Sequence, residues 1–136
     1  YIIESTYGLD RSVLAILFES YEEEKLDNDT REVMHFHPFL APYKVAILPL
    51  VKKYHKEKAE ELYKAFSKEF MTTYDETASI GKRYRRQDVI GTPFCITVDD
   101  ETINNNTVTI RDRDTMKQIT LSVNDVIDYV KSRIKF

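Results

Sequence analysis

The sequence predicts an α/β fold with a mixed, largely parallel five-stranded sheet flanked by helices, preceded by a separate strand-helix unit. Segments with strand and helix patterns alternate through the middle of the chain, which favours right-handed crossover connections. Two short apolar runs have the length and β-branched content of buried strands. The last third carries an alternating hairpin pattern followed by a helix.

Composition limits the classes of protein that this sequence fits. At 136 residues, with a 42% hydrophobic and a 32% charged fraction, the chain has the size of one domain with a piece of another. No apolar run approaches the roughly 20 residues that span a bilayer, so we expect no membrane segment. The net charge of -3 argues against non-specific nucleic-acid binding by the whole surface but permits a local basic patch.

The start of the sequence and its single cysteine indicate the kind of protein and its cellular compartment. The sequence has no initiating methionine and no leader pattern, so we expect a piece of a longer, cytoplasmic protein. Cys95 is the only cysteine, which excludes an internal disulfide and a cysteine-based zinc site. It lies in an apolar run, and we expect it to pack in the core.

The first 40 residues are predicted to form a separate unit from residues 41–136. Ile2 and Ile3 are expected to end a strand, and residues 9–21 form a helix with apolar side chains on nearly every face. Such a helix needs covering layers that a chain of this size does not supply. Residues 21–33 are rich in acids and Asn, which predicts a solvated linker or surface loop.

The middle of the chain predicts strand, helix, strand, helix, strand. The predicted elements are a strand over residues 44–50, a helix with one apolar stripe over 55–70, a strand over 70–74, a basic helix from Ser79 and a strand over 93–98. Gly91 stands where the cap at the end of the basic helix would be.

The last third predicts a hairpin and a closing helix. Residues 99–106 have the composition of a polar turn, and residues 108–111 and 118–121 alternate as antiparallel strands. Ser122 and Asp125 have the spacing of a capping box, and the residues after them keep helical periodicity to the end.

The most distinctive charged segment is the basic helix. Lys82, Arg83, Arg85 and Arg86 fall within about one helical turn of a chain that is otherwise mildly acidic. Arginine binds phosphate bidentately, so the segment predicts a phosphate partner, with a solvated helix face as the alternative. His35 and His37 could ligate a metal, but the neighbouring proline and the absence of cysteine partners favour a loop contact, and no metal site is expected. No catalytic constellation is legible.

Glu4-Ser5-Thr6-Tyr7-Gly8-Leu9-Asp10-Arg11, opening an apolar helix, resembles motif 3 of the class II aminoacyl-tRNA synthetases. The whole chain is similar to the C-terminal end of the homodimeric glycyl-tRNA synthetases. The segments that carry this likeness, in order, are YIIESTYGLDRS, LAPYKVAILPLVKK, YDETASIGKRYRRQDVIGTPFCITVD and TVTIRDRDTMKQI.

The resemblance implies roles for three residues near the start. Arg11 would lie against ATP, Glu4 would contact the glycine amino group, and Thr6 would stand where the family usually has a serine. On pattern alone, Glu4 and Thr6 are strand-end and turn residues. The parent enzyme would be a homodimer that uses glycine, ATP and Mg²⁺ to charge tRNA(Gly). This piece alone would bind tRNA, without catalysis and without a bound cofactor.

The resemblance also implies that residues 41–136 are an anticodon-binding domain. Arg111 and Arg113 alternate with aspartates, a mixture of donors and acceptors that suits base edges, while Lys82, Arg83 and Arg86 would hold the RNA backbone. The alternative for the hairpin is a tip in which each arginine pairs with a neighbouring aspartate. One alternative function is an accessory factor such as the processivity subunit of mitochondrial DNA polymerase. Another is a flavodoxin-like domain, but such a domain would require a phosphate-binding glycine loop after the first strand, and LPLVKKYHKEK contains none.

Overall fold

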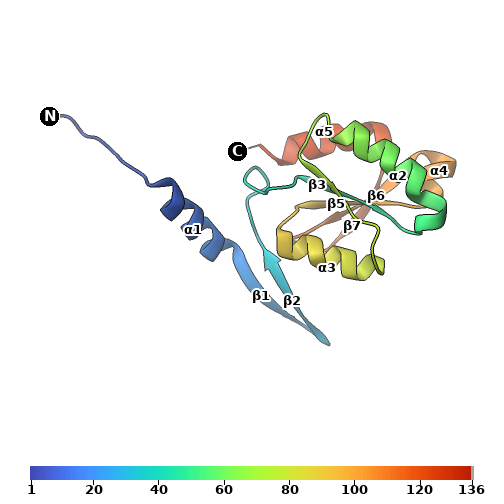
Figure 1. The fold of residues 1–136 in the computed structure, drawn as a ribbon, viewed down its shortest axis with the longest axis horizontal. Helices are drawn as coiled ribbons and strands as arrows, with labels where there is room; N and C mark the ends of the chain where they lie inside the picture. Colours follow the sequence, from blue (N-terminus) through green and yellow to red (C-terminus); the bar gives the residue numbers. More distant parts are fainter. Residues whose placement is uncertain (136) are drawn as a thin grey trace.

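A computed structural model describes residues 1–135 and shows a five-stranded sheet with helices on both faces (Figure 1). The strand order is β4-β3-β5-β6-β7. The strands are β3 (Val45–Pro49), β4 (Thr72–Tyr74), β5 (Phe94–Val98), β6 (Thr107–Asp112) and β7 (Gln118–Ser122).

The strand directions confirm the predicted mixed, largely parallel sheet. β3 pairs in parallel with β4 and β5, whereas β6 is antiparallel to both β5 and β7. Four strands therefore run in one direction, and only β6 runs in the other. The carboxyl ends of β3, β4 and β5 lie along one edge of the sheet, called the carboxyl edge below; the β6–β7 turn lies at the opposite, amino edge.

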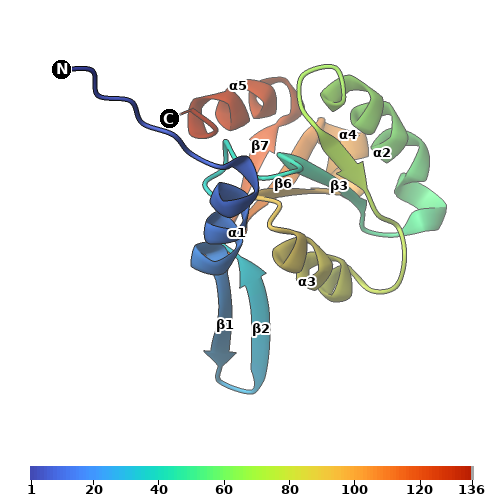
Figure 2. The same ribbon diagram turned by 60° about the vertical axis from the view of Figure 1, so that its left-hand side comes forward.

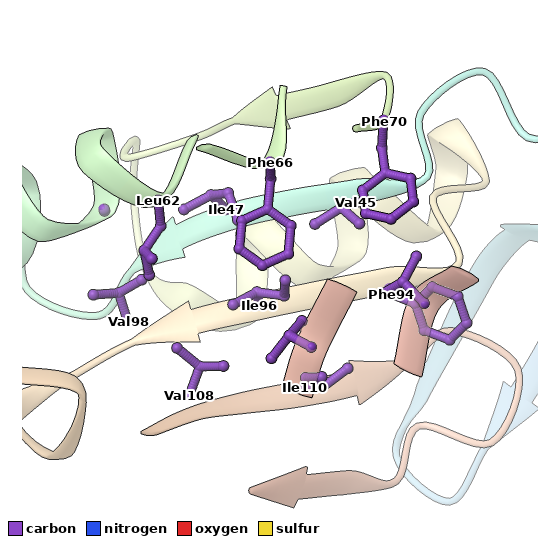
Figure 3. Packing of buried hydrophobic residues seen from close by; sticks show 13 residues of the cluster. Val45, Ile47, Leu62, Phe66, Phe70, Phe94, Ile96, Val98, Val108 and Ile110 are labelled. Carbon is purple, nitrogen blue, oxygen red and sulfur yellow. The ribbon is translucent and has the colours of Figure 1, made fainter. Parts of the chain in front are cut away.

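The core fills both faces of this sheet. On one face, apolar residues of β3, β5 and β6 pack against α2 (Lys52–Phe66) and α5 (Val123–Arg133), as Figure 3 shows for Phe66, Ile96 and Ile110. On the other face, Ala46, Leu48 and Cys95 pack against α3 (Ile80–Ile90). Burial of Cys95 confirms its predicted place in the core and raises the pKa of its thiol to about 12.

The N-terminal unit extends away from the sheet (Figure 2). It consists of α1 (Leu9–Ser20) and an antiparallel hairpin of β1 (Tyr21–Leu26) and β2 (Asp29–Met34). The prediction of a solvated linker over residues 21–33 was wrong, because alternate residues of β2 are buried against the domain, among them Arg31 and Val33. Residues 1–8 form no strand, since no neighbouring strand within the described chain pairs with them.

The predicted exposure of the first helix is confirmed. Most large apolar side chains of α1 face solvent, including Leu9, Val13, Leu14, Leu17 and Phe18. This face is not covered by the described part of the chain. Among residues 1–135, no helix is both long enough and apolar enough to cross a membrane.

Two predictions near the C-terminus need correction. Residues 99–106, predicted as a turn, contain the short helix α4 (Asp100–Asn105). Its capping box is formed by Asp99 and Thr102, each side chain accepting from the backbone N–H of the other. Ser122 does precede α5, but its side chain makes no cap hydrogen bond, so the predicted box with Asp125 does not form.

Candidate nucleic-acid interface

The structure places Arg111 and Arg113 in the protein interior rather than at an exposed hairpin tip. Both side chains lie on the α3 face of the sheet, with 5% and 2% of their surface exposed. Arg111 donates to both carboxylate oxygens of Asp88 on α3, at 2.8 and 3.0 Å. Its guanidinium also lies 4.8 Å from the centre of the Tyr84 ring.

Arg113 is held by backbone and side-chain acceptors. It donates to the carbonyls of Gly91 and Phe36, both at 2.7 Å, and to both carboxylate oxygens of Asp114 at 2.8 and 3.1 Å. The alternative of an arginine paired with its neighbouring aspartate therefore describes Arg113. Because the donors of Arg111 and Arg113 are used internally, neither guanidinium is free to meet a base edge.

Arg83 is a structural residue of α3. It is 4% exposed, and it donates to the carbonyl of Pro49 at the end of β3. It also donates to carbonyls of the β4–α3 loop, at 3.2 Å for Glu76, 3.2 Å for Thr77 and 2.7 Å for Ala78. These bonds tie two loops of the carboxyl edge together and leave Arg83 no exposed donor for phosphate.

Lys82 and Arg86 remain on the surface, in different situations. Lys82 is exposed in the first turn of α3 and makes no hydrogen bond or ion pair within the described chain. Arg86 is partly exposed but is bound to the Asp75 carboxylate, at 2.8 Å from its Nε. Lys82 is thus the one member of the predicted phosphate set whose charge has no internal partner among the described residues.

The predicted base-reading and phosphate-binding residues lie at opposite edges of the sheet. Arg113 adjoins the amino edge, where its N–H donates to the carbonyl of Pro93 just before β5. Lys82 lies at the carboxyl edge, because α3 begins where β4 ends. The two sets of residues therefore do not form one continuous surface.

The carboxyl edge gathers exposed side chains suited to RNA. Leu50 and Val51 join β3 to α2 and are exposed, as is Tyr54 in the first turn of α2, with 63% of its surface accessible. Lys53 is exposed, and its ammonium lies 5.4 Å from the Tyr54 ring centre. Lys52 pairs with Glu76 at 2.5 Å, and this hydrogen bond holds the Glu76 pKa below its ordinary value.

Carboxylates from the end of β5 complete this edge. Asp100 begins α4, and its side chain is 82% exposed. His55, which is 1% exposed, accepts from the Val51 N–H through Nδ1 at 3.0 Å, so Nε2 carries the hydrogen. Nε2 then donates to Asp100 at 2.9 Å and fixes the orientation of an exposed carboxylate.

The edge therefore offers an aromatic face for stacking, ammonium groups for phosphates and carboxylates that accept from base amines. Two helices longer than eight residues, α2 and α3, also begin here and direct their N-terminal N–H groups toward it. Together these groups can hold a single-stranded RNA segment.

The residues expected to meet ATP and glycine form no enclosed site in this chain. Glu4, Thr6 and Arg11 are exposed at the far end of the N-terminal unit. Arg11 lies in the first turn of α1 and makes no ion pair or hydrogen bond through its side chain among residues 1–135. A nucleotide or Mg²⁺ site at this point would need residues from outside the described chain.

Tyr54, Lys53 and Asp100 were missed as candidates from the sequence. The available signal was positional: ligands of open α/β sheets bind beyond the carboxyl ends of parallel strands. The two predicted buried strands are each followed by exposed polar residues, Lys52-Lys53-Tyr54 and Asp99-Asp100. The alternating Arg-Asp pattern was more conspicuous but belongs to the interior.

The chain is similar to known proteins over its whole length. A family model described as "Anticodon binding domain" matches residues 44–133. A glycine–tRNA ligase of Clostridium kluyveri is 56% identical over 137 residues, covering 100% of this chain and 29% of that protein. One from Bacillus anthracis is 53% identical over 136 residues, covering 100% of this chain and 30% of that protein. The chain thus spans about 30% of the length of these relatives.

A solved structure shares the fold. The RNA binding domain of threonyl-tRNA synthetase from Cryptosporidium parvum superposes with a TM-score of 0.67 at 22% identity. The superposition covers 73% of this chain and 25% of that one.

Proposed function

We propose that this chain, which belongs to the anticodon binding domain family, binds the anticodon loop of tRNA(Gly) along the carboxyl edge of its sheet. The observation that carries the proposal is the gathering of Tyr54, Lys53, Lys82 and Asp100 in the exposed first turns of α2, α3 and α4, beyond the ends of the parallel strands. Splayed bases would stack on Tyr54, and the lysines would contact phosphates.

The carboxylate of Asp100 would allow this edge to discriminate between anticodon bases. Glycine tRNAs carry cytosines at the second and third anticodon positions, and the exocyclic amine of cytosine is a donor that a carboxylate accepts. Because His55 holds Asp100 in one orientation, the acceptor is pre-positioned. We assign the choice between anticodons to Asp100 at the start of α4 rather than to Arg111 and Arg113.

The longer protein would be a cytoplasmic glycine–tRNA ligase that acts as a homodimer. Its relatives of this name support the reaction class, in which glycine and ATP, with Mg²⁺, yield a charged tRNA. Within it, Arg11 would bind ATP phosphate, and Glu4 and Thr6 would contact glycine once further layers cover the exposed face of α1. We place the domain boundary near residue 40, so that residues 41–136 carry the RNA-binding function.

Paired lysine substitutions test where the RNA binds. Lys53→Ala with Lys82→Ala removes two exposed cations of the carboxyl edge, so the salt dependence of tRNA(Gly) binding should fall by about one unit of slope per lysine. The control is Lys64→Ala with Lys68→Ala, which removes two exposed cations near the other end of α2. Equal losses in the two double variants would contradict the proposed location.

A further inference from the structure

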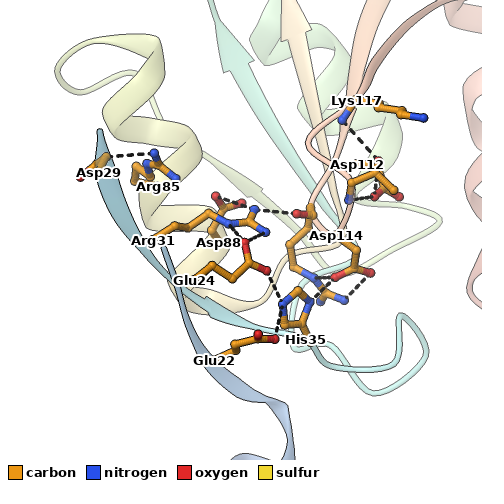
Figure 4. A network of polar contacts seen from close by, with 12 residues as sticks. Glu22, Glu24, Asp29, Arg31, His35, Arg85, Asp88, Asp112, Asp114 and Lys117 are labelled. Carbon is orange, nitrogen blue, oxygen red and sulfur yellow. Dashed lines mark hydrogen bonds and ion pairs between the residues drawn. The ribbon is translucent and has the colours of Figure 1, made fainter. Parts of the chain in front are cut away.

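A second polar cluster lies where the β1–β2 hairpin meets the β6–β7 turn, away from the carboxyl edge (Figure 4). Glu22 and Glu24 stand on β1, two residues apart, so their side chains share one face of the strand. His35 follows β2 and presents Nε2 to both carboxylates. One ligand atom of each residue lies within 4.8 Å of the others.

The separations between these atoms fit coordination to a common ion. Nε2 of His35 lies 2.9 Å from Glu24 Oε1 and 3.4 Å from Glu22 Oε2. A tetrahedral zinc ion with bonds of about 2.0–2.1 Å to nitrogen and oxygen spaces its ligands about 3.3 Å apart. The two separations from Nε2 bracket this value, and the two glutamate oxygens lie within 4.8 Å of each other, so one ion can be reached by all three atoms after side-chain adjustment.

Two residues outside this trio already bond to two of the proposed ligands, through atoms that would not contact the ion. Nδ1 of His35 bonds to Asp114 at 2.6 Å, and Asp114 is fixed by Arg113. The other oxygen of Glu24 is bound by Arg31, at 2.8 Å from Nε and 2.6 Å from Nη2. A carboxylate behind a histidine ligand and a hydrogen-bonded ligand carboxylate are the outer-shell contacts that orient metal ligands in proteins.

We propose that His35, Glu24 and Glu22 form a binding site for a divalent transition metal, with Zn²⁺ as the ion of choice and water at the remaining positions. An imidazole nitrogen with carboxylate oxygens suits zinc, whereas Mg²⁺ and Ca²⁺ prefer all-oxygen sites. Both ring nitrogens of His35 face carboxylates, Nδ1 that of Asp114 and Nε2 those of the two glutamates. With the ion bound to Nε2, Nδ1 carries the ring hydrogen and donates it to Asp114.

The proposed ion stabilises the junction between the hairpin and the RNA-binding domain. Its direct ligands belong to β1 and to the residue after β2, and His35 is bound through Asp114 to the β6–β7 turn. From the sequence, a loop contact was favoured over a metal site at His35 and His37. The metal site proposed here instead combines His35 with two glutamates, which the sequence pattern did not single out.

Glu22 gives a test that does not disturb the fold. Its side chain is 62% exposed, and its ion pair within the described chain is with His35 alone. Glu22→Gln therefore removes one ligand charge and leaves the bonds of His35 to Glu24 and Asp114 in place. Glu23→Gln is the matched control, because Glu23 is the next residue of the same exposed strand and its side chain points to the opposite face.

The experiment titrates ZnCl₂ into the untagged chain and follows the thermal midpoint, with Co²⁺ absorption as a report of ligand geometry. A ligand that binds only the folded state raises the midpoint, so wild type and Glu23→Gln should show one saturable rise and a tetrahedral Co²⁺ spectrum. Glu22→Gln should keep the metal-free midpoint and bind Zn²⁺ at least tenfold more weakly.

Two results would overturn the proposal. One is a wild-type midpoint that does not respond to Zn²⁺, which would leave His35 as the centre of an ordinary ion-pair cluster. The other is equal Zn²⁺ affinity in wild type and Glu22→Gln, which would place the ion at another histidine. Parallel titrations with MgCl₂ should produce no rise, and a Mg²⁺ response equal to that of Zn²⁺ would contradict the ligand chemistry.

Discussion

Four arginines, Arg31, Arg83, Arg111 and Arg113, are buried and bonded to internal partners. Arg31 and Arg111 share the carboxylate of Asp88, which is 0% exposed, and Arg113 is bound to backbone carbonyls and Asp114. Apolar periodicity indicates which residues face a core, but it does not reveal a charged residue that is buried with its counterion. The alternation of Arg111 and Arg113 therefore resembled a solvated hairpin tip.

Asp88 is the residue on which this interior network depends. Asp88→Asn leaves the guanidinium groups of Arg31 and Arg111 buried without their shared carboxylate, so we expect a loss of about 3 to 5 kcal/mol in unfolding free energy. Urea unfolding measures it. Asp128→Asn, on the exposed side of α5, should change stability by no more than about 0.5 kcal/mol. A comparable small loss for Asp88→Asn would show that the arginines find other partners.

Elements were predictable where apolar side chains decide the structure. The runs that form β3 and β5, the single stripe of α2 and the start of α5 were evident, because burial imposes a regular period. The β1–β2 hairpin was missed because its strands are mostly polar or charged and its one buried face is short. Asp27-Asn28, a two-residue loop between paired strands, was the available turn signal.

The end of α3 depends on a glycine in the left-handed region. Gly91 has φ of +85°, and a Cβ there would meet the Phe36 ring, with one ring carbon at 2.9 Å. Gly91→Ala should therefore destabilise the domain by about 2 to 4 kcal/mol, from backbone strain and overpacking combined. Gly81→Ala is the control at the other end of α3, where no atom lies within 4 Å of the added methyl.

Chemical denaturation of both variants gives the comparison. Gly81→Ala should be neutral or more stable by up to about 1 kcal/mol, because alanine is the better helix former. If Gly91→Ala matched Gly81→Ala in stability, the cap and its contact with Phe36 would be unimportant to the fold.

The β4–α3 loop should contribute an acid-sensitive increment of stability. Burial acts to raise the pKa of Asp75, but hydrogen bonds from Thr77 and Arg86 outweigh it and hold the pKa below its ordinary value. The contribution is therefore present above the unfolded value of about 3.9 and is lost as pH falls through the lower folded value. Asp75→Asn should lack this dependence.

Urea midpoints measured between pH 5.5 and pH 3 test the sign of this effect. The stability advantage of wild type over Asp75→Asn should shrink as pH falls toward and below about 4. Parallel curves for the two proteins would mean that Asp75 has the same pKa in the folded and unfolded states.

At the scale of the whole molecule, the sheet separates two kinds of residue. The amino edge holds buried Arg113 and the hairpin junction, whereas the carboxyl edge exposes Tyr54, Lys53, Lys82 and Asp100. The fold class followed from the sequence because strand and helix periods determine topology. The candidate interface did not follow from the sequence, because it is assembled from separate segments of the chain. Only the directions of the strands show that these segments lie at the same edge.

The binding location is tested most directly by amide chemical shifts of the ¹⁵N-labelled chain during titration with a glycine tRNA anticodon stem-loop. We predict that the largest changes fall in residues 50–54, 77–82 and 99–101, and that a stem-loop with both anticodon cytosines replaced weakens binding without moving the contact surface. Changes concentrated in residues 112–117 of the β6–β7 turn, with the carboxyl edge unaffected, would contradict the account.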